Sequence, residues 1–117
     1  MTSVSPPPRI PRPPVAVPNG WLGYVPNGMR ITVAGLVLVR QRPGTAKGVI
    51  FITLEDETGV CNVVVWKTLY EKFRRAVIAG RLLRITGKME RQGAVEHIIA
   101  DVVEDISPML DELVQVE

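Results

Sequence analysis

The sequence predicts an all-β domain, a five-stranded barrel with one helix between its third and fourth strands. Three observations lead to this fold class. Five segments combine β-branched or alternating apolar residues with turn signals at their ends. One amphipathic helical pattern lies between the third and the fourth of these segments. The repeated alternation of strand and helix that would predict a doubly wound parallel sheet is missing.

The first two predicted strands enclose a loop. Residues 31–39 are almost continuously apolar, and Gly35 inside this run indicates a bulge or a sharp bend. Proline and glycine mark residues 40–48 as a loop by composition. Residues 49–55 then alternate, which places Phe51 on the face opposite the aliphatic side chains.

The third strand follows a tight turn and leads into the helix. Residues 56–59 have the composition of the turn, and residues 60–66 form the strand, in which alternation directs Cys61 inward. Residues 67–79 carry apolar side chains at helical spacing, and Gly80 is a suitable residue to end the helix.

Two more strands complete the barrel. Residues 81–89 and 94–103 are predicted strands joined by a turn at residues 90–93. Five strands with a helix in this position are the layout of an OB-fold Greek-key barrel. So short a sheet must coil strongly to close, and Gly35 and Gly87 lie where a bend would help.

Composition divides the chain into three segments. They are a proline-rich arm or linker over residues 1–28, the barrel domain over residues 29–106, and an acidic tail over residues 107–117. Eight of the ten prolines lie between positions 6 and 26, and they predict neither a helix nor a central strand there. A short apolar stretch around Leu22 is the part of the arm that would dock on the barrel.

The charges are distributed unevenly. Residues 1–100 carry all 14 basic residues and six acidic ones, a net charge of +8, whereas residues 101–117 carry six acidic residues and no basic one. A basic body suits a polyanionic partner through phosphate neutralisation and counterion release. Ordinary solvated charge is the alternative interpretation. We expect the acidic tail to oppose nucleic-acid binding or to cover the basic surface.

Several classes of function are excluded by residue counts. Cys61 and His97 are the sole cysteine and histidine, so the chain can form neither an internal disulfide nor a Cys/His metal cluster. No metal, cofactor or set of catalytic residues is expected. A continuous apolar run of about 18 residues and a secretory-signal pattern are both missing, which predicts a cytoplasmic protein without membrane contact.

Four stretches of the sequence together resemble one known family. They are VAGLV at residues 33–37, RQRPGTAKG at 40–48, FITLEDETG at 51–59 and VVVW at 63–66. These residues closely resemble the C-terminal OB domain of bacterial error-prone C-family DNA polymerases, the damage-induced paralogue of the replicative α subunit. The resemblance extends over about residues 29–110. More broadly, this segment is similar to the anticodon-binding OB domains of aminoacyl-tRNA synthetases.

The resemblance implies DNA binding within a translesion machine. The palm, fingers, PHP and helix-hairpin-helix regions of the polymerase have no counterpart in these 117 residues, so we expect no polymerisation by this chain and no enzymatic activity. Met1 and the proline-rich arm are compatible with a free-standing reading frame and with a fragment of a larger polymerase.

An OB surface binds a single strand through two kinds of interaction: bases stack on aromatic side chains, and phosphates pair with basic side chains. We therefore expect both kinds of residue on the predicted binding face. Phe51 is the leading stacking candidate, with Thr53 on the same face. In similar anticodon-binding OB domains, an aromatic residue at the matching second-strand position stacks on a base. The alternative is that the inner and outer faces of this strand are reversed, so that Phe51 belongs to the core.

The other candidates each have a plain structural alternative. Trp66 either shares the outward face or packs on the helix with Tyr70, and Asn62 is either a base-edge ligand or an exposed polar residue. His97 either contacts nucleic acid or is an isolated, hydrogen-bonded histidine. The phosphate-binding candidates are cations in the two flanking loops and on the fourth strand: Arg40, Arg42, Lys47, Arg84, Lys88 and Arg91.

The function that this pattern predicts is a non-catalytic module that binds single-stranded DNA. Two alternatives stay open. OB barrels also bind proteins, so the chain is alternatively an interaction module for other proteins of a translesion polymerase complex. RNA is the alternative nucleic-acid partner for the same face.

Overall fold

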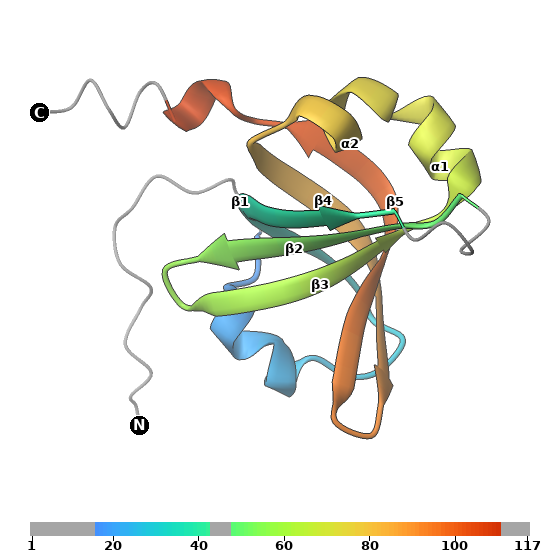
Figure 1. Ribbon diagram of the computed structural model, residues 1–117. Helices are drawn as coiled ribbons and strands as arrows, with labels where there is room; N and C mark the ends of the chain where they lie inside the picture. The colour runs from blue at the N-terminus through green and yellow to red at the C-terminus, as the bar shows by residue number, and fades with distance from the viewer. Residues whose placement is uncertain (1–15, 43–47, 111–117) are drawn as a thin grey trace, which may run out of the picture.

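The structure is a computed structural model that describes residues 16–42 and 48–110. Its five strands close into a barrel in the order β1-β2-β3-β5-β4, as Figure 1 shows. The predicted fold class is therefore confirmed. The elements are a 3₁₀ helix η1 (Asn19–Tyr24), β1 (Arg30–Gln41), β2 (Ile50–Asp56), β3 (Gly59–Val65), α1 (Lys67–Lys72), α2 (Arg74–Ala79), β4 (Leu82–Gln92) and β5 (Val95–Asp105).

Strand β1 belongs to both halves of the barrel. Its first part pairs with β4 and its second part with β2, and the change of partner occurs at Leu36. A side chain at Gly35 would lie 2.6 Å from the carbonyl oxygen of Glu55, and one at Gly87 would collide with the carbonyl oxygen of Ile99. Both glycines therefore allow neighbouring backbones to approach closely at the bends that sequence indicated.

The ring order decides which strands share a face. Strands β2 and β3 form an antiparallel hairpin, and a short parallel contact between β3 and β5 closes the ring. In a closed ring of five strands, the strand opposite the β2–β3 hairpin is β4, because β4 pairs with β1 and β5 alone. The outer surfaces of the hairpin and of β4 therefore face opposite directions.

The core fills the barrel as the alternation predicts. The side chains that β2 and β3 contribute to the core cluster are the alternate residues, including Ile52, Leu54, Cys61 and Val63, whereas Val64 on the outer face is buried but lies outside this cluster. Leu83, Ile85 and Met89 from β4 and Ile98 from β5 complete the centre of this cluster. Burying each large aliphatic side chain contributes about 1.5–3 kcal/mol to folding.

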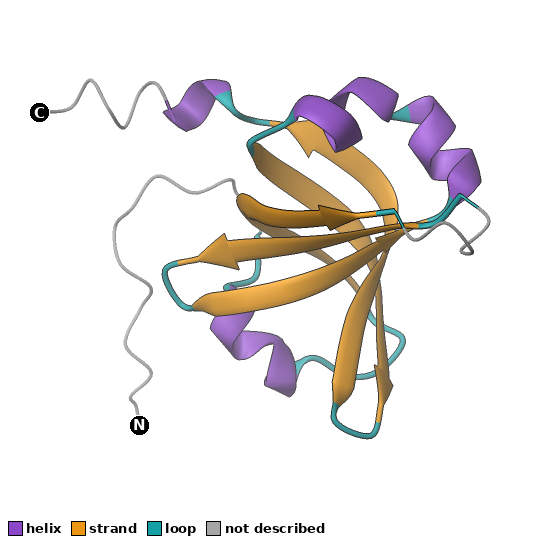
Figure 2. Ribbon diagram, in the orientation of Figure 1, coloured by secondary structure: helices purple, strands orange, loops and turns teal. Residues whose placement is uncertain are grey.

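The helical region between β3 and β4 covers one end of the barrel, and η1 lies at the other end (Figure 2). The helix predicted over residues 67–79 is present but is interrupted at Phe73, whose φ of −116° and ψ of 33° separate α1 from α2. Phe73 and Leu69 are half-buried against the core, and Val77 is fully buried in it. The break lets two short helices follow the curved barrel rim.

Residues 16–28, which composition assigns to the arm, pack on the barrel. Leu22 and Val25 join the core, and the side-chain amide of Asn19 donates to the carbonyls of Leu54 and Gly59. The expectation that prolines exclude a helix here is wrong for residues 19–24, because this hexapeptide contains no proline. Pro18 directly precedes it, where a missing N–H costs no intrahelical bond. Residues 1–15 lie outside the described part.

In residues 16–42 and 48–110, every helix is too short to cross a bilayer.

Candidate nucleic-acid interface

The outer face of the β2–β3 hairpin collects the aromatic and polar candidates. Phe51 pairs with Val64 of β3 and with Gln41 of β1, so these three side chains share one row across the outer face. Thr53 pairs with Asn62 in the next row. Phe51 is half-buried and is not part of the core cluster, which places it on the face that alternation indicates.

Two side chains on this face, Asn62 and Trp66, expose groups that can contact a ligand. The Thr53 hydroxyl donates to Asn62 Oδ1 at 3.2 Å, which leaves the Asn62 amide nitrogen to point away from β2. Trp66 follows the last residue of β3 and is 53% exposed, so it extends the face toward α1 rather than packing beneath the helix. An indole exposed to this extent offers a flat surface for stacking.

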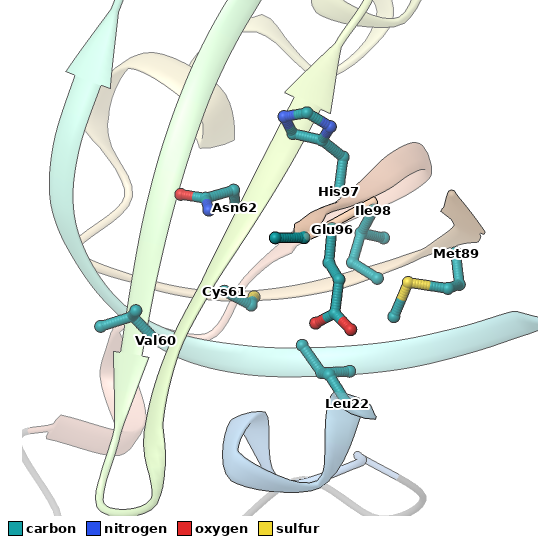
Figure 3. A pocket seen from close by; sticks show the side chains of 9 residues that line it. Leu22, Val60, Cys61, Asn62, Met89, Glu96, His97 and Ile98 are labelled. Carbon is teal, nitrogen blue, oxygen red and sulfur yellow. The ribbon is translucent and has the colours of Figure 1, made fainter. Parts of the chain in front are cut away.

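A pocket of about 130 Å³ opens where β3 and the β4–β5 hairpin separate. Figure 3 shows Asn62 and His97 at one end of it and Leu22 at the other. Cys61 and Met89 are buried residues of its lining. The pocket continues the Thr53–Asn62 row onto β5, so His97 joins the same surface as the hairpin candidates.

Arg91 holds the β4–β5 hairpin against η1. Its Nε donates to Glu96 Oε2 at 2.9 Å, and its Nη2 donates to the carbonyls of Leu22 and Val25 at 3.0 and 2.9 Å. The Asn27 side chain accepts a further bond from the Arg91 backbone N–H. The guanidinium predicted to bind phosphate is therefore engaged in shaping one wall of the pocket.

Arg84 and Lys88 lie on the opposite side of the barrel from Phe51. Both are on the outer face of β4, and Arg84 makes a bidentate pair with Glu104 at 3.0 and 2.9 Å. Lys88 is exposed beside Arg30, its partner in the β1–β4 register. The structure does not bring these two cations to the β2–β3 face.

The cations of the loop between β1 and β2 have different surroundings. Arg40 donates to the carbonyls of Val77 and Gly80, so it caps the end of α2. The Arg42 guanidinium lies over the ring of Tyr70, 4.8 Å from its centroid. Lys47 lies outside the described residues. Among the described cations of this loop, Arg42 is therefore the one directed at an exposed surface.

Half of the acidic residues after position 100 belong to β5. Asp101 pairs with Arg30 at 3.2 Å, and Glu104 pairs with Arg84. Hydrogen bonds from the hydroxyl and then the backbone N–H of Ser107 lower the pKa of Asp105. Asp101 and Glu104 thus have a cationic partner on the barrel surface, and Asp105 is hydrogen-bonded to Ser107.

The thiol of Cys61 is buried in the core. Burial, and secondarily the charge of Asp56, raise the pKa of Cys61 to about 12. A thiolate is the reactive form of cysteine, so this residue is a core side chain. Within residues 16–42 and 48–110, no three His, Cys, Asp or Glu side chains come together as metal ligands.

Sequence reasoning missed three parts of this surface. Leu22 is a pocket wall that comes from outside the predicted barrel, and no local pattern indicates its contact with β3 and β5. Val39 is an exposed apolar residue in the same row as Thr53 and Asn62, and Val60 is an exposed apolar residue in the row of Glu55. The apolar periodicity of both strands obscured them, because it did not separate inner from outer positions.

Comparison with known proteins agrees with this geometry. A family model described as OB-fold nucleic acid binding domain matches residues 31–106. Asparaginyl-tRNA synthetase from Pyrococcus horikoshii superposes with a TM-score of 0.58 at 25% identity, covering 68% of this chain and 20% of that one. The Stn1-Ten1 complex of S. pombe shares the fold, with a TM-score of 0.59 at 20% identity over 72% of this chain and 62% of that one.

Relatives in sequence are bacterial error-prone DNA polymerases. The enzyme of Ruegeria pomeroyi is 64% identical over 84 residues, covering 72% of this chain and 8% of the polymerase. Error-prone DNA polymerase 1 of Rhizobium meliloti is 53% identical over 89 residues, covering 76% and 8%, and the Caulobacter vibrioides enzyme is 48% identical over 97 residues, covering 83% and 9%. The chain thus spans less than a tenth of the curated relatives that it matches. It belongs to the family of OB-fold nucleic acid binding domains, in the form found in error-prone DNA polymerases.

Proposed function

We propose that this chain is a non-catalytic module that binds single-stranded DNA for an error-prone, translesion DNA polymerase. The observation that carries the proposal is the β2–β3 face, where Phe51, Asn62 and Trp66 are aligned on one side of a rigid hairpin. Identity of 48–64% to error-prone DNA polymerases supports DNA as the polymer.

The face offers stacking and hydrogen bonding to successive bases. Phe51 and Trp66 provide aromatic surfaces, and each base stacked on such a ring contributes about 1–3 kcal/mol. Between β3 and β5, the amide nitrogen of Asn62 and the imidazole of His97 border a pocket with room for part of a base. Stacking tolerates every base, so the module would hold damaged or undamaged template strands alike.

A fluorescence-anisotropy titration tests the proposal. The protein is titrated with labelled oligo-dT, the matching oligo-U and a duplex of equal length, at two salt concentrations. We expect oligo-dT to bind more tightly than the duplex, because stacking needs unpaired bases, and binding to weaken at higher salt. Equal binding of DNA and RNA would identify a general single-strand module. Absence of binding to all three at low salt would refute the proposal.

An apolar surface favours protein interaction as the second candidate function. Leu36, Leu38 and Val39 are 41–51% exposed around the bulge of β1, and Val60 of β3 is 51% exposed beside Glu55, the strand partner of Leu36. Exposed apolar clusters of this kind often mark protein interfaces. If single strands fail to bind, other proteins of a translesion polymerase complex become the expected partners.

A further inference from the structure

The helical end of the barrel carries a concentration of unpaired cations. Over residues 67–79 the sequence has four basic residues and one acidic residue, Glu71, a net charge of +3. Lys67, Lys72, Arg74 and Arg75 are all exposed. Within the described part of the chain, none of these four forms an ion pair, whereas Arg84 and Arg91 on the barrel surface each do.

A continuous series of contacts joins this end to the β2–β3 face. Gln41 is the strand partner of Phe51, and Arg42 follows it directly. The Arg42 guanidinium lies 4.8 Å from the centroid of the Tyr70 ring, and the Arg74 guanidinium lies 5.9 Å from the same ring. Tyr70 thereby holds two cations near one another, and one of them, Arg42, directly follows the strand partner of Phe51.

A second connection runs along β3. Trp66, which is exposed at the end of the face, directly precedes Lys67, the first residue of α1. Figure 1 shows α1 starting where β3 ends, beside the point at which the described part of β1 stops. The aromatic face and the cationic helices are therefore neighbouring parts of one surface.

The cations are poorly explained by folding stability. Arg74 and Arg75 are the first two residues of α2, whose first turn contains no acidic residue. Positive charge at a helix N-terminus opposes the partial charge of the unpaired N–H groups, so it does not stabilise the helix. A polyanion lying over this end would offset this effect.

We infer that the helical end is a second, phosphate-binding surface, formed by Arg42 and Arg74, which lie over Tyr70, together with the exposed cations Lys72 and Arg75. It binds the backbone of the same single strand after the strand leaves the β2–β3 face. The inference rests on the proposed function and extends it, because it gives the strand a path and predicts a longer site. Because this surface is positively charged, the phosphodiester backbone of the strand is the ligand that it favours.

The experiment combines strand length with single-charge variants of the complete chain. Anisotropy titrations use oligo-dT of about 4 and about 16 nucleotides, which bracket the usual site sizes of one OB domain. Arg74→Gln is compared with Arg30→Gln, which removes the same charge on the β4 side of the barrel, where Arg30 pairs with the exposed Asp101. The double variant Arg74→Gln/Arg75→Gln measures the size of the effect.

For the long strand, Arg74→Gln should lower the log–log salt slope by about 0.7 and the double variant by about 1.4, since each single-strand phosphate contact releases about 0.7 counterion. The short strand should bind all variants with nearly the wild-type affinity, and Arg30→Gln should behave as wild type with both lengths. Thermal unfolding checks that each variant is folded.

Three results would overturn the inference. Equal losses for Arg74→Gln and Arg30→Gln would mean that net charge alone acts. Unchanged binding of the long strand by the double variant would mean that the strand does not reach the helices. Equal losses for the short and the long strand with Arg74→Gln would mean that the effect does not depend on a longer path of the strand. In these cases the wild type still binds oligo-dT, whereas failure of the wild type to bind either length removes the proposed function itself.

Discussion

Replacement of Phe51 by alanine separates base stacking from core packing. The side chain is half-buried on the outer face of β2 and lies outside the core cluster. Full burial of a phenylalanine contributes about 1.5–3 kcal/mol, and the larger part of the Phe51 side chain is buried, so its loss should lower the free energy of unfolding by about 1–2.5 kcal/mol. Truncation of a core phenylalanine would cost about 3–5 kcal/mol.

The binding loss should be of a different size and kind. Removal of one stacked base costs about 1–3 kcal/mol. This corresponds to an increase in Kd of roughly 5- to 150-fold. The salt slope should remain almost unchanged, because stacking releases few counterions. Anisotropy with oligo-dT measures both quantities, and urea denaturation measures stability.

A matched control is provided by Tyr24, an aromatic residue of η1 that is 88% exposed and lies outside the β2–β3 face. Tyr24→Ala should leave the affinity for oligo-dT at the wild-type value. If Phe51→Ala unfolds the domain, Phe51 belongs to the core and the assignment of faces is wrong. If the variant folds and binds as the wild type does, the β2–β3 face is not the single-strand site.

Three further predictions concern stability and reactivity. Arg91→Ala should lower the free energy of unfolding by about 1–3 kcal/mol, because Glu96 and two backbone carbonyls lose their donor, and an unchanged urea midpoint would contradict this. Burial raises the pKa of Cys61 to about 12, so a disulfide reagent at neutral pH should modify the native protein far more slowly than the urea-unfolded chain; equal rates would disprove the burial. The pKa of Asp105 is lower in the folded state, so its contribution to stability is present above the ordinary aspartate pKa and is lost as the pH falls through the folded value. Asp105→Asn should therefore flatten the acid limb of a stability-against-pH curve, and an identical limb would count against the hydrogen bonds from Ser107.

Local pattern was sufficient to predict the strands and, in residues 49–55, the face of each side chain. Alternation in residues 49–55 separates Ile52 from Phe51, and the structure places these two on opposite faces. Period-two patterns report the face directly, since neighbouring side chains in a strand must point in opposite directions. The order of strands and helix then restricted the topology to the OB-fold barrel, which the structure confirms.

The environment of the cations could not be predicted in the same way. Arg84 finds Glu104 at a separation of 20 residues, and Arg91 finds the Leu22 carbonyl at a separation of 69. Such partners depend on the ring order and on how η1 closes the barrel, neither of which leaves a local signal. The described basic candidates, which looked alike in the sequence, therefore have different surroundings: Arg84 and Arg91 form ion pairs, whereas Arg42 lies over Tyr70 and Lys88 is exposed.

The position of Leu22 makes the shape of the pocket depend on a residue outside the matched domain. Leu22 forms one wall of the pocket shared by β3 and the β4–β5 hairpin, yet it lies ahead of residues 31–106, where the family match begins and ends. Two chains identical over those 76 residues but different at this position would enclose differently shaped gaps. Variation in a preceding segment would therefore change the shape of this pocket while every strand residue stays the same.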